Sequence, residues 1–135
     1  MDQLIYATTS GAVFASMLAY IAAQYSGGMA LKSDGRLFNW GRNYDNQLGD
    51  GTSTNRSAPV QVRLPGKKVV AIAAGRFHTL ALVEGGEVWA WGCNAYGQIG
   101  DGSSAAERRS PTEVLGLTEV AAVSAGVGYS LALTR

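Results

Sequence analysis

The feature that most constrains this chain is an internal repeat with a period of 51 residues. The segment that begins at Ile21 recurs at Ile72 and again at Val123. The three copies read IAAQYSGGMAL, IAAGRFHTLAL and VSAGVGYSLAL. Repetition at a fixed period of this size is typical of stacked architectures, in which each unit buries its apolar surface only against a neighbouring unit. The chain is therefore predicted to be a row of similar structural units.

Two further motifs recur at the same offset, a tryptophan–glycine pair and a glycine–aspartate–glycine turn. The repeated positions are Trp40, Gly41, Gly49, Asp50 and Gly51 in the first copy, and Trp91, Gly92, Gly100, Asp101 and Gly102 in the second. One residue is inserted before Pro111 relative to Pro59, and the register is restored at Val120. Such compensation keeps strands in phase and confines length variation to loops.

Within one repeat the apolar residues alternate with polar ones, and glycine-rich turns separate the short runs, which is the pattern of strands and hairpins. In the second copy a tight turn is expected at Gly85 and Gly86. Four strands are predicted there, at Val69–Ala74, His78–Val83, 87–91 and 111–115, with a long loop over 92–110. Four short antiparallel strands per repeat predict an all-β fold built from the blades of a β-propeller.

The repeat boundaries divide the chain into a first repeat at 20–68, a second at 69–119 and the start of a third at 120–135. Residues 1–19 are interpreted as an eroded N-terminal half-blade or a short extension, because 4–16 resemble two strands and their turn. A short amphipathic helix is the alternative there. The chain holds about two and a half repeats, which are too few to close a propeller ring alone, so the propeller is predicted to be partial.

Composition narrows the function classes. The net charge is +1, so no overall field favours nucleic acid or an anionic membrane, and neither partner is predicted. One cysteine, Cys93, and one histidine, His78, offer neither an internal disulfide nor a Cys/His metal cluster. No cofactor or metal is expected, and a reducing compartment such as the cytoplasm is slightly favoured.

Residues 20–135 resemble the repeats of the regulator of chromosome condensation family. The resemblance is carried by Ala-Gly-x-x-His-x-Leu-Ala-Leu at 74–82, by the tryptophan–glycine pairs and by Gly-Gln-Ile-Gly-Asp-Gly at 97–102. The family histidine occurs once, as His78, and its equivalents are Gly27 and Tyr129. The resemblance implies a seven-bladed propeller, which this chain has too few repeats to close alone. It also implies that Gly75 and His78 are structural, with the histidine hydrogen-bonded to nearby backbone, and that the repeated tryptophans pack between blades.

The loop that follows each third strand is the expected binding surface, because loops vary without disturbing the buried strands. Tyrosine and arginine are enriched in binding hot spots. The candidate partner-binding residues are Tyr44, Asp45, Arg56, Tyr96, Glu107 and Arg108.

No catalytic motif is present, and the sequence is interpreted as a non-catalytic protein–protein interaction module, completed by self-association or by docking on a larger partner. The family resemblance implies two alternatives: guanine-nucleotide exchange on a small GTPase, or inhibition of an enzyme by a secreted propeller.

Overall fold

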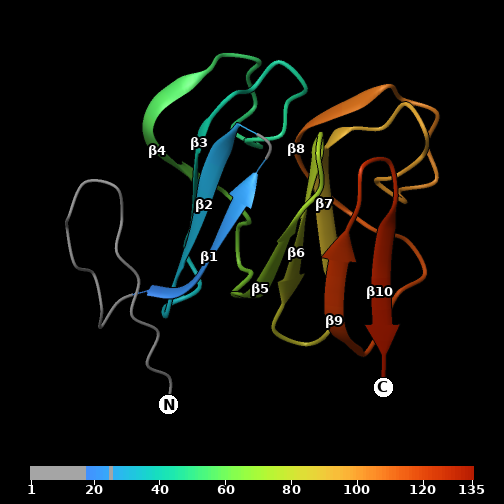
Figure 1. Ribbon diagram of the computed structural model, residues 1–135. Helices are drawn as coiled ribbons and strands as arrows, with labels where there is room; N and C mark the ends of the chain where they lie inside the picture. The colour runs from blue at the N-terminus through green and yellow to red at the C-terminus, as the bar shows by residue number, and fades with distance from the viewer. Residues whose placement is uncertain (1–17, 25) are drawn as a thin grey trace.

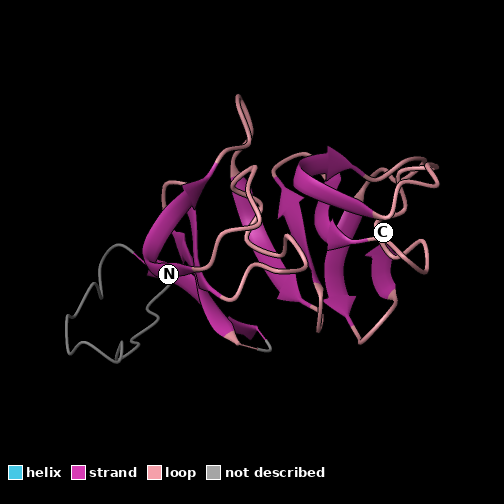
Figure 2. Cartoon of the chain, turned by 90° about the horizontal axis from the view of Figure 1, so that it is seen from above, coloured by secondary structure: helices cyan, strands magenta, loops and turns pink. Residues whose placement is uncertain are grey.

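The computed structural model describes residues 18–24 and 26–135, for 18–24 only as backbone. The predicted half-blade at 4–16 lies outside the described residues. Every regular element in the described part of the chain is a strand, which confirms the all-β fold. Within the same residues there is no helix long and apolar enough to cross a membrane. Figure 1 shows three sheets standing side by side, and Figure 2 shows the same row from above.

The three sheets are antiparallel meanders in which each strand pairs with the next one along the chain. The first sheet contains β1 (Leu18–Gln24), β2 (Gly27–Lys32), β3 (Leu37–Gly41) and β4 (Arg56–Val62). The second contains β5 (Val69–Ala74), β6 (His78–Val83), β7 (Val88–Cys93) and β8 (Glu107–Glu113), and the third contains β9 (Val120–Ala125) and β10 (Ser130–Thr134). The chain therefore forms two four-stranded blades and a two-stranded sheet, a partial and unclosed propeller.

The fourth strand begins earlier than the sequence pattern indicated. The loop after β7 spans 94–106, so the prediction of a loop to residue 110 is wrong, and Glu107 and Arg108 belong to β8. Arg56 likewise begins β4. These strands lie at the edges of their sheets, where one neighbour supplies the hydrogen bonds and side chains stay mostly exposed. An edge strand of this kind needs no apolar alternation, so its polar sequence resembled a loop.

Each tryptophan–glycine pair lies at an irregularity in its sheet. The register between β3 and β4 shifts between Asn39 and Gly41, and that between β7 and β8 shifts between Ala90 and Gly92. Gly41 and Gly92 have φ values of 108° and 106°, a conformation that residues with a Cβ rarely adopt. The bulge lets the strand bend at the tryptophan, and glycine permits the bend.

Two apolar clusters fill the spaces between the sheets. The first lies between the first and second sheets and includes Met29, Leu31 and Trp91. The second lies between the second and third sheets and includes Leu80, Leu82 and Ile99. All six residues of β6 are buried because this strand has a sheet on both sides. We call the first space the closed junction and the second the open junction.

Candidate functional site

Each long loop is held by an asparagine at its start. The Asn43 side-chain amide donates to the Thr52 carbonyl at 2.8 Å, and its Oδ1 accepts the Leu48 N–H at 3.0 Å. Asn94 makes the equivalent bonds to the Ala105 carbonyl at 2.8 Å and the Ile99 N–H at 3.0 Å. Both amides are buried, so the loops are fixed by satisfied internal hydrogen bonds.

The repeated aspartates organise the second half of each loop. Asp50 accepts hydrogen bonds from the Thr52 N–H at 2.9 Å and hydroxyl at 2.7 Å, and from Arg56 Nε at 2.8 Å. Asp101 accepts the same set from Ser103 and from Arg108 Nε, the latter at 2.5 Å. Arg56 and Arg108, predicted as partner-binding loop residues, are therefore strand residues that brace the turns of their own repeats.

These contacts lower the pKa values of the two aspartate carboxyls. Burial by itself would raise the pKa of Asp50, but the hydrogen bonds from Thr52 and Arg56 and the arginine charge outweigh it and lower the pKa below its usual value. The pKa of Asp101 is lowered against the same burial effect by Ser103 and Arg108. Both carboxylates therefore stay ionised at neutral pH and accept the hydrogen bonds that close the turn.

The closed junction is organised around the indole of Trp91, which is fully buried. Its Nε1 donates to the Gln47 carbonyl at 2.9 Å, and the Thr79 hydroxyl donates to the same oxygen at 2.9 Å. Gly49 lies beneath the ring, and a Cβ there would be 2.5 Å from the indole nitrogen. Residues 47–49 of the first repeat thus form a seat for a tryptophan of the second.

Further bonds join the same two sheets. The Asn46 amide donates to the Glu107 carboxylate at 2.5 Å, and the Gly51 N–H donates to the Arg109 carbonyl at 2.9 Å. Glu107 also pairs with Arg109 at 3.1 Å. Glu107, a predicted partner-binding residue, therefore contributes to the contact between repeats.

The open junction contains a relay of hydrogen bonds. The Ser130 hydroxyl donates to the Gln98 carbonyl at 2.7 Å, and His78 Nε2 lies 2.9 Å from the same hydroxyl. With the serine proton directed to the carbonyl, we assign the imidazole proton to Nε2, so that His78 donates to Ser130. His78 therefore contacts a side-chain hydroxyl on the third sheet in addition to the Tyr129 backbone.

The arrangement of His78 and Ser130 does not form a catalytic pair. His78 is fully buried, the serine proton is directed to a carbonyl, and no described carboxylate hydrogen-bonds the imidazole. Burial lowers the pKa of His78, an effect that a hydrogen bond from the imidazole to the Tyr129 backbone only partly opposes, so the neutral form is favoured. In the described ranges no group of three or more His, Cys, Asp or Glu side chains could hold a metal ion.

A cluster of aromatic and arginine side chains joins the start of the loop after β3 to the turn between β5 and β6. The Arg42 guanidinium lies 5.6 Å from the ring centre of Tyr44 and 5.9 Å from that of Phe77, and Arg76 lies 4.9 Å from the Phe77 ring. Arg42 also pairs with Asp45 at 3.2 Å. We call these five residues the arginine–aromatic cluster. It brings together the predicted residues Tyr44 and Asp45, and Tyr44 is 67% exposed.

Tyr96 lies apart from this cluster, at the open junction. It is 83% exposed, and its ring lies close to Gly128, where a Cβ would be 3.1 Å from Cδ2. Sequence reasoning missed Arg42, Arg76 and Phe77, which do not recur between repeats: Cys93 replaces Arg42, and Gly128 replaces Phe77. Thr79 and Ser130 were also missed, although both carry a hydroxyl at one repeat position.

The chain belongs to the family of the regulator of chromosome condensation (RCC1) repeat, whose model matches residues 34–82 and 85–133. It is 47% identical over 87 residues to the ultraviolet-B receptor UVR8 of Arabidopsis thaliana, covering 61% of this chain and 20% of the receptor. It is 38% identical over 115 residues to the human E3 ubiquitin-protein ligase HERC2, covering 83% of this chain and 2% of the ligase.

Two solved structures have a similar fold. Human WBSCR16 superposes with a TM-score of 0.83 at 22% identity, over 90% of this chain and 31% of that one. Prp20p of Saccharomyces cerevisiae superposes with a TM-score of 0.74 at 26% identity, over 88% and 31%. The chain thus spans under a third of the length of each of these relatives.

Proposed function

We propose that the chain is a non-catalytic protein–protein interaction module, which presents the arginine–aromatic cluster to a protein partner. The observation that carries the proposal is the cluster itself. Tyrosine and arginine are enriched in binding hot spots. Arg42 and Tyr44 lie on a loop that the buried hydrogen bonds of Asn43 hold in place. A rigid loop loses little conformational entropy when a partner binds.

The cluster is suited to a protein surface that offers carboxylates and aromatic rings. Arg42 already lies against two rings and a carboxylate, so a partner carboxylate near Arg76 would extend the same network. Among solved relatives, yeast RCC1 (Prp20) has been crystallised bound to Kap60, and Prp20p has been studied for binding to Gsp1p and histones. These relatives support a protein partner for the present chain.

The test is quantitative affinity enrichment with the purified chain and two variants. Tyr44→Ala and Phe77→Ala together truncate the cluster, while Leu115→Ala truncates another exposed apolar side chain, 62% accessible, which lies beside Gly102 of the second repeat. We expect specific partners that bind the wild type and the Leu115 variant but lose at least about tenfold in affinity with the double variant, a change of ~1.4 kcal/mol.

Thermal unfolding of each variant shows that the fold is retained. A partner that binds the double variant as tightly as the wild type would place the interaction elsewhere and contradict the role of the cluster. The exchange-factor alternative is checked by release of a labelled guanine nucleotide from a small GTPase. Acceleration of release would favour that alternative.

A further inference from the structure

The arginine–aromatic cluster occurs once, although the scaffold that carries it recurs. The asparagine that fixes the loop, the glutamine carbonyl that accepts a hydroxyl and the aspartate turn are present in both copies. The second copy keeps the same bonds within its loop over 94–106. At the five positions of the cluster it has Cys93, Ala95, Tyr96, Val127 and Gly128. The cluster is therefore not required for such a loop to fold.

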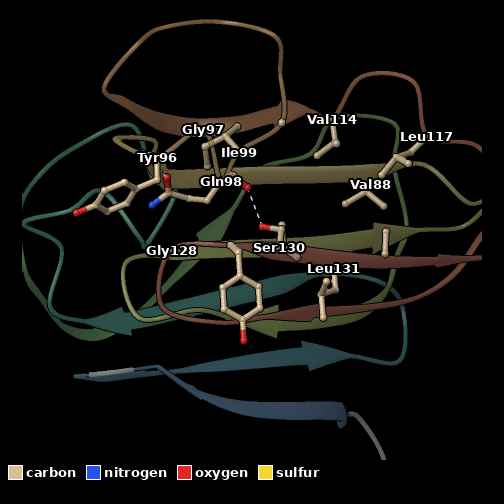
Figure 3. Close-up of a pocket in the computed structure, with 14 residues that line it drawn as sticks. Val88, Tyr96, Gly97, Gln98, Ile99, Val114, Leu117, Gly128, Ser130 and Leu131 are labelled. Carbon is tan, nitrogen blue, oxygen red and sulfur yellow. Dashed lines mark hydrogen bonds between the residues drawn. The ribbon is translucent and has the colours of Figure 1, made fainter.

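The equivalent place in the second copy shows how the scaffold packs without charge. Tyr96, the equivalent of Asp45, lies beside Gly128, the equivalent of Phe77 (Figure 3). A Cβ at Gly128 would lie 3.1 Å from the tyrosine ring. None of the five equivalent residues is charged. The two arginines and the aspartate of the first copy are thus additions to a surface that the fold can build from neutral residues.

The cluster has a net charge of +1, from Arg42 and Arg76 against Asp45. These charges reach solvent, because the side chains of Arg42 and Asp45 are 31% and 28% exposed and Arg76 is exposed. The guanidinium groups lie over the rings of Tyr44 and Phe77. An arginine held over a ring loses less rotamer freedom when it pairs with a carboxylate, so the site favours an anion.

Asp45 shows what the arginines accept and also limits their attraction for a further anion. Its Oδ2 lies 3.2 Å from an Nη2 atom of Arg42. A guanidinium carries five N–H donors, so a single carboxylate does not exhaust it. A second carboxylate near Arg42 would nevertheless be repelled by the charge of Asp45. Removing that charge should therefore strengthen the binding of an acidic partner and weaken that of a basic one.

The charge balance favours a protein over a nucleic acid as the source of the anion. Proteins that bind single-stranded nucleic acid combine aromatic rings with a positively charged groove that follows the phosphates. The whole chain has a net charge of +1, and an aspartate lies inside the cluster. An acidic peptide segment needs only a local match of this kind.

We propose that the arginine–aromatic cluster binds an acidic segment of a partner protein, in which a carboxylate pairs with Arg42 and Arg76 and a neighbouring aromatic ring packs on Tyr44. The proposal rests on the proposed function and deepens it by naming the chemistry of the partner. Tyr44 offers the ring surface, since it is 67% exposed. Asp45 sets the strength of the complex through its repulsion of the incoming carboxylate.

The probe is a set of labelled synthetic peptides that share a central phenylalanine. The flanking residues on both sides of it are aspartate in the first peptide, asparagine in the second and lysine in the third. Binding to the intact chain is measured by fluorescence anisotropy. We expect saturable binding of the aspartate peptide, at least about tenfold tighter than that of the asparagine peptide, and weaker binding still of the lysine peptide. No saturable binding of the aspartate peptide, or equal binding of the asparagine peptide, would overturn the proposal.

Three charge variants locate the aspartate peptide through the sign of their effects. Asp45→Asn should tighten binding by about threefold, and Arg76→Gln should weaken it by about as much. Arg36→Gln removes the same charge as Arg76→Gln from an exposed arginine that precedes β3, at the opposite end of that strand from Arg42, and should leave the affinity unchanged. Reversed signs, or equal effects of the two arginine variants, would overturn the proposal. Thermal unfolding checks that each variant keeps its fold.

The outcome is separable from that of the proposed function. If Tyr44→Ala with Phe77→Ala weakens partner binding while the charge variants act with reversed sign, the acidic partner falls and the interaction module stands. If the aspartate peptide binds with the expected signs but enriched partners tolerate the double variant, the site for acidic segments stands and the proposed function falls. An oligothymidine that binds more tightly than the aspartate peptide and displaces it would assign the cluster to nucleic acid and overturn the proposal.

Discussion

The closed and open junctions are built from equivalent residues, one repeat apart, yet one excludes solvent and the other does not. Gln47 and Gln98 both present a carbonyl to a hydroxyl on the next sheet, at 2.9 Å and 2.7 Å. Only the closed junction also holds an indole, and there Gly49 is buried whereas Gly100 is exposed. The comparison teaches that the loop seat forms without the tryptophan, since the asparagine and aspartate bonds fix each loop from within.

The largest expected effect is at the indole. Trp91→Ala removes a fully buried side chain and its hydrogen bond to Gln47, so we expect a loss of about 3–5 kcal/mol in the free energy of unfolding. Leu131→Ala, at an open-junction position, should change it by no more than about 0.5 kcal/mol. Urea denaturation followed by circular dichroism measures both, and similar losses would break the distinction between the junctions.

Two glycine substitutions separate the steric clash with Trp91 from the effect of backbone strain. Gly49→Ala and Gly66→Ala impose equal backbone strain, at φ 71° and 72°, but only the Gly49 variant drives a Cβ into Trp91. We expect Gly49→Ala to be more destabilising by about 1–3 kcal/mol, the usual cost of overpacking. The measurement is the urea midpoint of each variant. Equal midpoints would show that the ring can move aside.

The two aspartate turns should behave alike, because each repeat builds its own. Asp50→Asn and Asp101→Asn each weaken the bonds from a hydroxyl residue and an arginine, and we expect about 1–2 kcal/mol of destabilisation from either change. Thermal unfolding of the two variants compares them directly. A large difference between them would mean that the junctions, and not the loops, decide how strongly the turns are held.

The smallest effect is a pH dependence confined to the open junction. His78 is the single histidine of the chain, its equivalent in the first sheet is Gly27, and its pKa is lowered by burial from the ordinary 6.5. Because the folded state disfavours the charged imidazole, stability is complete above pH ~6.5 and is lost as the pH falls from there through the folded pKa. Urea midpoints at pH 7.5 and 5.5 measure the loss.

The matched variant is His78→Gln, which keeps a donor for Ser130 but does not titrate. The urea midpoint of this variant should be no lower at pH 5.5 than at pH 7.5. The aspartates do not interfere, because their pKa values are already lowered from an ordinary 3.8 and they lose their contribution only at more acid pH. A variant that loses stability as the wild type does would assign the acid effect to another group.

The sequence determined the repeat, the hairpins and the family. The pattern within Val69–Ala74 and His78–Val83 predicted two strands with the bounds observed. The repeat offset predicted that Trp40 and Trp91 are equivalent, and the structure shows a bulge beside each of them. Local rules suffice for these features because a strand or turn depends on residues close in sequence. The repeat boundaries at 20, 69 and 120 and the half-blade at residues 4–16 stay predictions.

Only the tertiary structure decided which contacts the candidate residues make. Arg56, Glu107 and Arg108 are engaged in turns and between sheets, while Arg42, Arg76 and Phe77 gather beside Tyr44 from segments far apart in sequence. The same is true of the seat, where one carbonyl serves two donors from the next repeat. Such contacts join residues whose separation along the chain carries no local signal, and they exist only once the sheets have packed.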